Sequence, residues 1–389
     1  QWESTTDEQV LETARHLIRL ATNDNPPPLL DPFAGGGSIP LEAQRLGLEA
    51  HASDLNPVAV MINKALIEIP PRFADRPPVN PRDREKMGSG TGWKGAAGLA
   101  ADVRYYGEWM RDRAWEKIGH LYPDCNGETV IAWLWARTVK CPNPACGAQM
   151  PLVSSFWLSK KKANQAWVEP RIDRKAKSVQ FTVKTGNGGP LDPPKVSRGA
   201  NFRCLVCGEI APEQHLKGEG MAGRMEAQLM AIVTEGQSGR SYYAPSSNHE
   251  NIAAQAQPNW RPVGQLADDT RNIWCRIYGF DDFADLFTPR QLVALTTFSD
   301  IVADARTQIQ SDALAAGLIG DDVPLRQSGA GAQAYAEAVS VYLAFAVDRG
   351  ANYWSSLTIW ADFIVQTFGR QALPMIWDFS EANPFSNST

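Results

Sequence analysis

The sequence predicts a mixed α/β protein in which a doubly wound parallel sheet is interrupted by a metal-bound β ribbon and accompanied by additional helices. Two observations predict this. An apolar run that ends at Asp31 is followed by three glycines and then by helical spacing, which is the order strand, turn, helix. Further along lie two pairs of closely spaced cysteines, in a chain of 389 residues that is long enough for two or three domains.

The N-terminal segments follow the order β-α-β-α. Residues 6–21 have an amphipathic spacing that predicts a helix ahead of the first strand. Residues 49–53 predict a second short strand, with Asp54 at its carboxyl end. In a parallel sheet both Asp31 and Asp54 would lie at the edge where such folds bind ligands.

A helix is expected directly after Asp54. Asn56 is a good N-cap and Pro57 suits the first helical position. The helix should end at about residue 69, before Pro70 and Pro71. Residues 70–98 are rich in Pro, Gly and Arg and predict a long surface loop.

The remainder of the chain alternates between helical and strand-like spacing. We expect helices at residues 101–120, 221–233, 289–309 and 333–348, and strands at residues 129–139, 179–183 and 372–379. The chain then divides into the first half of the α/β domain (1–70), a loop and helical linker (71–128), a ribbon insert (129–214), a mixed helical region (215–332) and a helix and strand that return to the first domain (333–389).

Four cysteines predict a zinc site. Cys141 with Cys146, and Cys204 with Cys207, form two short knuckles, and each knuckle is followed by a glycine that permits a tight turn. Four thiolates in two such pairs suit tetrahedral Zn²⁺. The strands between the pairs would form a ribbon closed at its base by the metal, and four unrelated buried cysteines are the alternative.

Positive charge is concentrated in the ribbon. The net charge of −5 argues against a uniformly basic nucleic-acid binder, but residues 140–203 (the basic segment) hold twelve Lys and Arg and three acidic residues, a local charge of +9. Aromatic residues lie among these charges: Phe156, Trp157, Trp167, Phe181 and Phe202. Cations that meet phosphates and rings that stack on bases suit DNA, and a solvated charged surface is the alternative.

A cytoplasmic protein without a membrane segment is expected. No signal peptide opens the chain, and paired cysteines in a reducing compartment more often hold metal than form disulfides. The longest helical apolar run, at 334–347, is too short to span a bilayer and includes Glu337. Cys125 and Cys275 lack close partners and are expected to be ordinary thiols. The first residue is Gln1 rather than Met, so we expect a piece of a longer chain.

The glycine turn after Asp31 admits several ligand interpretations. A dinucleotide site prefers G-x-G-x-x-G, but Pro40 stands where the third glycine should be, and a P-loop needs a following Gly-Lys-Ser/Thr that is missing. S-adenosylmethionine remains: the glycines would lie against its amino-acid end, and Asp54 would accept hydrogen bonds from the ribose hydroxyls. A glycine turn with no ligand is the alternative.

At these residues the sequence resembles the large prokaryotic adenine-specific DNA methylases that carry an internal zinc ribbon. The similar segments are 31–43 (DPFAGGGSIPLEA), 53–59 (SDLNPVA), the split four-cysteine ribbon, 286–292 (LFTPRQL) and 367–372 (TFGRQA). The resemblance implies a class I methyltransferase-like domain, incomplete in this chain, to which residues 1–70 and 333–389 belong.

The same resemblance implies an S-adenosylmethionine-dependent enzyme that methylates adenine N6 in double-stranded DNA, in a restriction-modification or phage-defence setting. The cofactor-binding residues would be Asp31, Phe33, Ala34, Gly35, Gly36, Gly37, Asp54, Leu55 and Asn56. An RNA or protein methylase would share this cofactor site and differ only in its acceptor.

The catalytic motif of that family is missing. Amino methylases use Asp/Asn/Ser-Pro-Pro-Tyr/Phe, whose oxygens accept hydrogens from the target amine while the ring stacks on the flipped base. Segments that begin at Asn25 and Asp192 lack the ring, and one that begins at Asn383 lacks a proline. The catalytic residues are therefore unknown, and we expect them beyond residue 389 or in a partner subunit. The chain alone should be inactive and should bind cofactor weakly or not at all. The alternative is a non-catalytic zinc-ribbon DNA-binding subunit with a methyltransferase-like scaffold.

Overall fold

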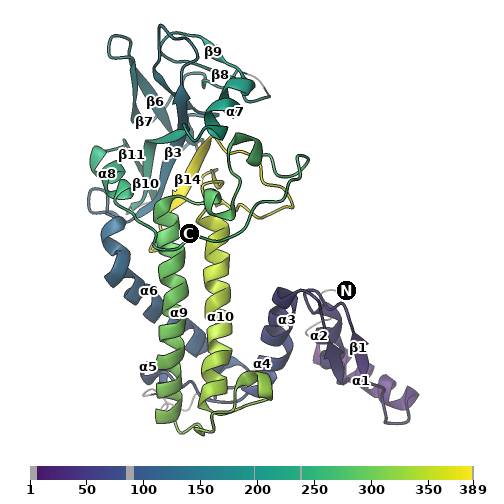
Figure 1. Cartoon of the computed structure of the whole chain (residues 1–389). Coiled ribbons are helices and arrows are strands. Elements are labelled where there is room, and N and C mark those ends of the chain that lie inside the picture. The colour runs from purple at the N-terminus through teal and green to yellow at the C-terminus, as the bar shows by residue number, and fades with distance from the viewer. Residues whose placement is uncertain (1–6, 85–91, 197, 237–238, 388–389) are drawn as a thin grey trace. The chain divides into compact units, whose positions relative to one another are not determined.

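The computed structural model describes residues 7–84, 92–196, 198–236 and 239–387 (Figure 1). It is a mixed α/β structure with several sheets, and it divides into two compact units, residues 1–110 with 301–346 and residues 111–300 with 347–389. The long helices α6 (Ala97–Ile118), α9 (Pro289–Ala315) and α10 (Ala332–Tyr353) each contribute residues to both units. The central part of the predicted loop, residues 85–91, lies outside the described residues.

The first unit contains the predicted β-α-β-α order. Its elements are α1 (Glu8–Ala21), β1 (Leu29–Asp31), α2 (Ser38–Arg45) and β2 (Ala50–Ala52), followed by further helices. The side chain of Asp7 accepts hydrogen bonds from the backbone N–H groups of Gln9 and Val10, which caps α1. Strands β1 and β2 are parallel. Within the described part of this unit they form the only sheet, so the predicted doubly wound sheet is represented by two strands.

The helix after Asp54 is longer than expected. It consists of α3 (Pro57–Asn63), one π-helical turn (Lys64–Glu68) and α4 (Ile69–Arg72). The prediction that Pro70 and Pro71 end the helix is wrong. The wider π turn lets a new helical segment begin at Ile69, so the prolines lie in its first turn, where no backbone N–H donor is needed.

A buried carboxylate holds the following segment to two helices. Asp102 of α6 is 0% exposed. It accepts hydrogen bonds from the backbone N–H groups of Val79 and Asn80, from the Asn80 amide and from the Tyr335 hydroxyl of α10. The segment that these contacts hold leads directly into α5 (Pro81–Arg84). Burial raises the pKa of Asp102, although its four donors oppose that rise.

The second unit is built around an antiparallel sheet with β3 (Val130–Lys140) at its centre (Figure 1). Strand β3 pairs with β10 (Glu226–Gly236) on one side and with β14 (Asp378–Ala382) and β4 (Gln149–Leu152) on the other, and β11 (Gly239–Tyr243) pairs with β10. All side chains of β3 from residue 130 to 139 are buried. A strand covered on both faces carries a nearly continuous apolar sequence, which β3 does.

The partners of β3 revise two expectations. Residues 221–233 were expected to form a helix, but α7 (Glu213–Met221) ends where that helix should begin, and β10 follows it. The helix prediction is wrong because β10 is buried between β3 and β11, and an apolar run without periodicity does not distinguish helix from strand. The expected strand at 372–379 begins only at Asp378, and it joins β3 rather than the β1–β2 sheet.

The ribbon shares a core with this sheet. Its strands form a three-stranded sheet, β5 (Trp157–Ser159), β6 (Ala166–Asp173) and β7 (Ser178–Thr185), and a short pair, β8 (Phe202–Arg203) and β9 (Ile210–Ala211). A hairpin of β12 (Ile359–Trp360) and β13 (Ile364–Val365) and the helix α8 (Ser247–Ala254) complete the unit. Phe202 packs edge-on against Trp377, and buried residues from the ribbon, β10 and β14 belong to one apolar cluster. Residues 129–214 are therefore continuous with the rest of the second unit.

A buried ion pair joins α9 to β14. Arg290 and Glu381 have side chains that are 1% and 2% exposed, and their charged atoms are 2.6 Å apart. Glu381 also accepts hydrogen bonds from the Trp135 indole (2.8 Å) and the Thr288 hydroxyl (2.7 Å). The Arg290 guanidinium lies 4.0 Å from the centroid of the Trp133 ring. The segment 286–292, one of those that resemble the methylases, therefore has a structural role in this core.

Candidate functional site

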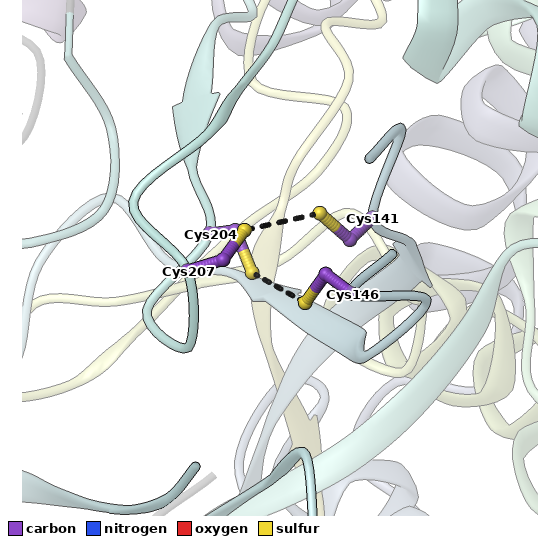
Figure 2. A group of neighbouring side chains, drawn as sticks. All are labelled: Cys141, Cys146, Cys204 and Cys207. Atoms are coloured by element: carbon purple, nitrogen blue, oxygen red, sulfur yellow. Dashed lines mark hydrogen bonds between the residues drawn. The ribbon is translucent and has the colours of Figure 1, made fainter. Parts of the chain in front are cut away.

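The four predicted zinc ligands converge. The sulfur of Cys141 lies 3.6 Å from that of Cys207, and the sulfur of Cys146 lies 4.0 Å from that of Cys204. All four sulfurs lie within 4.8 Å of one another, and Figure 2 shows them directed toward a common centre. Tetrahedral ligation with Zn–S bonds of about 2.3 Å places sulfurs about 3.8 Å apart. The four cysteines can therefore hold a metal ion such as zinc.

Local backbone geometry presents each pair of thiols. In the first knuckle the N–H groups of Cys146 and Gly147 both donate to the Asn143 carbonyl, at 3.0 Å. In the second, the N–H of Gly208 donates to the Cys204 carbonyl at 2.8 Å. Gly147 and Gly208 have φ values of 60° and 84°, a region that a residue with a Cβ rarely adopts. The glycine after each knuckle thus has the role that the sequence predicted.

The thiols differ in their tendency to ionise. Burial raises the pKa values of Cys141 and Cys204. Burial also opposes ionisation of the exposed Cys207, but the N–H of Glu209 and the neighbouring thiols outweigh it and lower the pKa of the Cys207 thiol. Zinc binds thiolates, so the cluster must lose its thiol protons when a metal enters. Cys125 and Cys275 are buried and lie outside this group within the described chain.

The glycine turn and the second acid meet at the carboxyl ends of β1 and β2. The carboxylate of Asp54 accepts a hydrogen bond from the Gly35 N–H on one oxygen and from the Asn56 N–H on the other, both at 2.8 Å. These backbone donors lower the pKa of Asp54, the Asn56 donor contributing most. Asp31 is buried, and its side chain accepts from the Phe33 N–H at 3.1 Å. The fold therefore brings both predicted acids to one edge.

The three glycines have different surroundings. A Cβ on Gly37 (φ +79°) would lie 2.6 Å from the Asn63 side-chain oxygen, so this position requires glycine. A Cβ on Gly35 or Gly36 would meet nothing within 4 Å. Asn63 donates to the carbonyls of Gly35 (3.0 Å) and Ala59 (2.8 Å) and so anchors the turn to α3. Sequence analysis did not single out Asn63, because one asparagine on a predicted helix carries no signal of its distant partner.

The surface beside the turn is open and partly apolar. Phe33 is 84% exposed and Leu55 is 99% exposed. A cavity of about 340 Å³, within the ~300–1,000 Å³ range of small-molecule sites, is lined by two predicted cofactor residues, Ala34 and Asp54, and also by Asn63. Ala34 and Asp54 are the predicted cofactor residues that line this cavity, whereas the three glycines do not line it. The described unit leaves the outer faces of Phe33 and Leu55 uncovered.

None of the three incomplete catalytic motifs forms a base-binding site. Asn383 is 2% exposed; its amide donates to the Val130 carbonyl at 2.7 Å and accepts from the Phe385 N–H at 3.0 Å. Phe385 packs edge-on against the rings of Trp115 and Tyr122. This segment is a turn in the core of the second unit. The other two segments, at residues 25–28 and 192–195, lack the aromatic ring that would hold a base.

The basic segment has fewer available rings than predicted. Phe156, Phe181 and Phe202 are 1%, 6% and 0% exposed, so the expectation that these rings stack on bases is wrong. They are core residues because the ribbon packs on β10 and Trp377. Trp157 and Trp167 are partly exposed and lie edge-to-face, with centroids 6.1 Å apart. Lysines 160–162 are exposed.

The structure therefore contains a cysteine cluster in the second unit and a glycine turn with a flanking carboxylate in the first. In the described part of the chain no helix has the length and apolar character needed to cross a membrane. Comparison of the chain with protein-family models, with curated proteins and with solved structures finds no match.

Proposed function

We propose that this chain is the cofactor-binding and DNA-contacting part of an S-adenosylmethionine-dependent DNA methyltransferase that acts on adenine N6. The observation that carries the proposal is the position of the Asp54 carboxylate. It lies against the Gly35 N–H at the carboxyl edge of two parallel strands, beside a glycine surface with open space in front of it. A ribose presents two hydroxyl donors, and a carboxylate at this edge is the acceptor that they need.

Each neighbour of Asp54 has a part in cofactor binding. The backbone at Gly35 and Gly36 allows close approach, because no side chain occupies that space. The exposed side chain of Leu55 offers an apolar surface for the adenine ring of the cofactor. The cofactor supplies the methyl group, and the residues of the turn hold it in place.

The second unit would provide contact with DNA. The cysteine cluster, once it holds Zn²⁺, ties the two ends of the basic segment together. The basic segment carries a charge of +9, and phosphate contacts by such charges supply most of the non-specific affinity for DNA. None of the three incomplete motifs provides the amine acceptors, so the proposal includes a further segment or a partner subunit that does. The resemblance to adenine-specific DNA methylases implies a restriction-modification or phage-defence setting, and the paired cysteines suit a cytoplasmic location.

One observation favours a second candidate, a non-catalytic zinc-ribbon DNA-binding subunit with a methyltransferase-like scaffold. Both oxygens of Asp54 already accept backbone hydrogen bonds, so the carboxylate has a structural role in the turn even without a ligand. The two candidates share the metal and the DNA. They differ in whether the glycine turn binds S-adenosylmethionine.

The test is transfer of tritium from [methyl-³H]S-adenosylmethionine to adenine in duplex DNA by the native polypeptide that contains these residues. Gly36→Ala places a methyl group in the open space before the turn without meeting another atom, so the fold should be kept while transfer falls at least tenfold. Gly107→Ala on α6 is the matched control, since its Cβ also meets nothing within 4 Å. A duplex already methylated at adenine N6 should accept no label.

Two outcomes contradict the proposal. If Gly36→Ala transfers label as fast as Gly107→Ala, the cofactor does not lie on this turn. If the native polypeptide binds the duplex but labels no adenine, the non-catalytic subunit is the better interpretation.

A further inference from the structure

The second unit contains a cavity that the proposed methyl transfer does not use. Its volume is about 570 Å³, within the ~300–1,000 Å³ range of small-molecule sites, and it lies among the ribbon sheet, the β12–β13 hairpin and β14. The lining includes three indole rings, two lysines and two carboxyl groups: Trp157, Trp360, Trp377, Lys160, Lys195, Asp362 and Asp378. Apolar walls with a few polar groups are typical of a ligand site rather than of a packing defect.

One wall carries the Asp362 carboxylate. The Oδ1 atom of Asp362 is buried and has no hydrogen-bond partner among the described residues. Asp362 lies in the turn between β12 and β13 with φ of 60°, a left-handed conformation that Asp and Asn adopt more readily than most residues. The N–H of Ala361 donates to the Phe363 carbonyl at 2.9 Å across this turn. The Asp362 side chain lines the cavity, and a carboxylate there can accept an N–H or O–H group from a ligand.

The indole rings are held in fixed positions. The indole N–H of Trp360 donates to the Leu158 carbonyl at 2.8 Å, and the Arg240 guanidinium lies 5.4 Å from the ring centroid. Trp157 packs edge-to-face against Trp167, with centroids 6.1 Å apart. Rigid aromatic walls lose little conformational entropy when a flat apolar group packs on them.

The remaining polar groups combine both signs of charge. Lys160 and Lys195 bring two cations to the cavity. The Asp378 carboxyl accepts hydrogen bonds from the N–H groups of Ser154 and Ser155, and burial raises its pKa to about 6. A ligand that suits this lining has a flat ring, a hydrogen-bond donor for Asp362 and a negative charge for the lysines.

We propose that this cavity binds one unstacked nucleotide whose base carries an exocyclic amino group. The amino group donates to the Asp362 carboxylate, the base packs against the walls that contain Trp157 and Trp360, and the phosphate meets Lys160 and Lys195. The inference rests on the proposed function in one respect, that DNA is the source of the nucleotide. The base bound in this cavity contributes to recognition of the DNA and is not the base that accepts the methyl group.

The experiment is a titration of the full chain with dAMP, dCMP, dGMP and TMP, in which tryptophan fluorescence reports binding. The three nucleotides with an exocyclic amine should bind at least fivefold more tightly than TMP, which has none. Asp362→Asn keeps a side chain that tolerates positive φ but replaces the carboxylate with an amide, so the affinity for dCMP should fall about tenfold and the preference over TMP should disappear. Asp322→Asn is the matched control, because Asp322 also has positive φ (52°) and is exposed. Its titration should match that of the wild type.

A second variant tests the phosphate contact. Lys160→Ala should weaken binding of dCMP and leave binding of deoxycytidine unchanged. The proposal is overturned if the wild type binds TMP as tightly as dCMP, if Asp362→Asn matches Asp322→Asn, or if spermidine displaces dCMP with higher affinity, which would identify a cation site. These titrations contain no S-adenosylmethionine, so this proposal and the methyltransferase proposal fail independently.

Discussion

Glu381→Gln should destabilise the second unit strongly. In the native protein the Glu381 carboxylate accepts hydrogen bonds from Arg290, Trp135 and Thr288. The substitution keeps the shape of the side chain but removes its charge, and it turns one acceptor oxygen into an NH₂ group that faces donors. Arg290, whose side chain is 1% exposed, is then left without a counter-ion.

The magnitude follows from this burial. Removal of one partner from a buried ion pair costs about 3–5 kcal/mol of unfolding free energy, because the remaining charge stays desolvated. For a unit of this size each kcal/mol corresponds to about 2–4 °C in Tm, so a fall of about 6–20 °C is expected. The control is Glu116→Gln. Glu116 and Arg113 form an ion pair of 3.0 Å whose side chains are 63% and 52% exposed, so its loss should cost about 0–1 kcal/mol.

The assay is urea unfolding monitored by near-ultraviolet circular dichroism. This signal is sensitive to the environment of packed aromatic side chains such as Trp133 and Trp135. Glu381→Gln should lower the urea concentration at the unfolding midpoint and leave the dependence of the unfolding free energy on urea unchanged. Glu116→Gln should leave the midpoint nearly unchanged. The double variant Arg290→Met with Glu381→Leu should recover part of the loss, because no unpaired charge remains. If Glu381→Gln and Glu116→Gln unfold within about 1 kcal/mol of each other, the stated role of the buried pair is refuted.

Four other predictions test the metal, the turn, the DNA contact and the buried carboxyl group. Metal analysis of the purified chain should find about one Zn²⁺ per chain, with the zinc lost on Cys146→Ser or Cys204→Ser and kept on Cys125→Ser; zinc retained in both ligand variants would contradict the cluster. Gly37→Ala should lower the unfolding free energy of the first unit by more than about 1 kcal/mol, because Gly37 has a positive φ and its Cβ would lie close to the Asn63 oxygen. Gly36→Ala should change that free energy by less than about 0.5 kcal/mol. Equal melting curves for the two variants would argue against this geometry. Replacement of Lys160, Lys161 and Lys162 by Gln should reduce the slope of log K against log salt for duplex binding by about 3, and an unchanged slope would count against phosphate contacts there. Asp378 has a native pKa of about 6 against an ordinary value of 3.8, so its stabilising contribution is present below about pH 4 and lost as the pH rises through 6; Asp378→Asn should abolish that loss in unfolding measured from pH 4 to 7.

The amino-acid sequence by itself determined the features that depend on neighbours in the chain. The strand, glycine turn and helix around Asp31 follow from a short apolar run, backbone freedom at glycine and a capping order that acts within one or two turns. The cysteine knuckles were predictable for the same reason, because the residues within each pair and the glycine after it form one local turn. Helices at 289–309 and 333–348 were found from their periodicity, and the structure extends each of them by a few residues.

Only the tertiary structure decided the features that depend on distant partners. Residues 226–236 form a strand because β3 and β11 flank them, and their apolar sequence is equally compatible with a helix. Arg290 and Glu381 are 91 residues apart, so the local sequence around either residue does not predict a buried ion pair. The burial of Phe202 likewise arises where separate segments pack together, since its ring contacts Trp377. Such contacts follow from long-range burial and charge pairing, to which no local pattern of residue types corresponds.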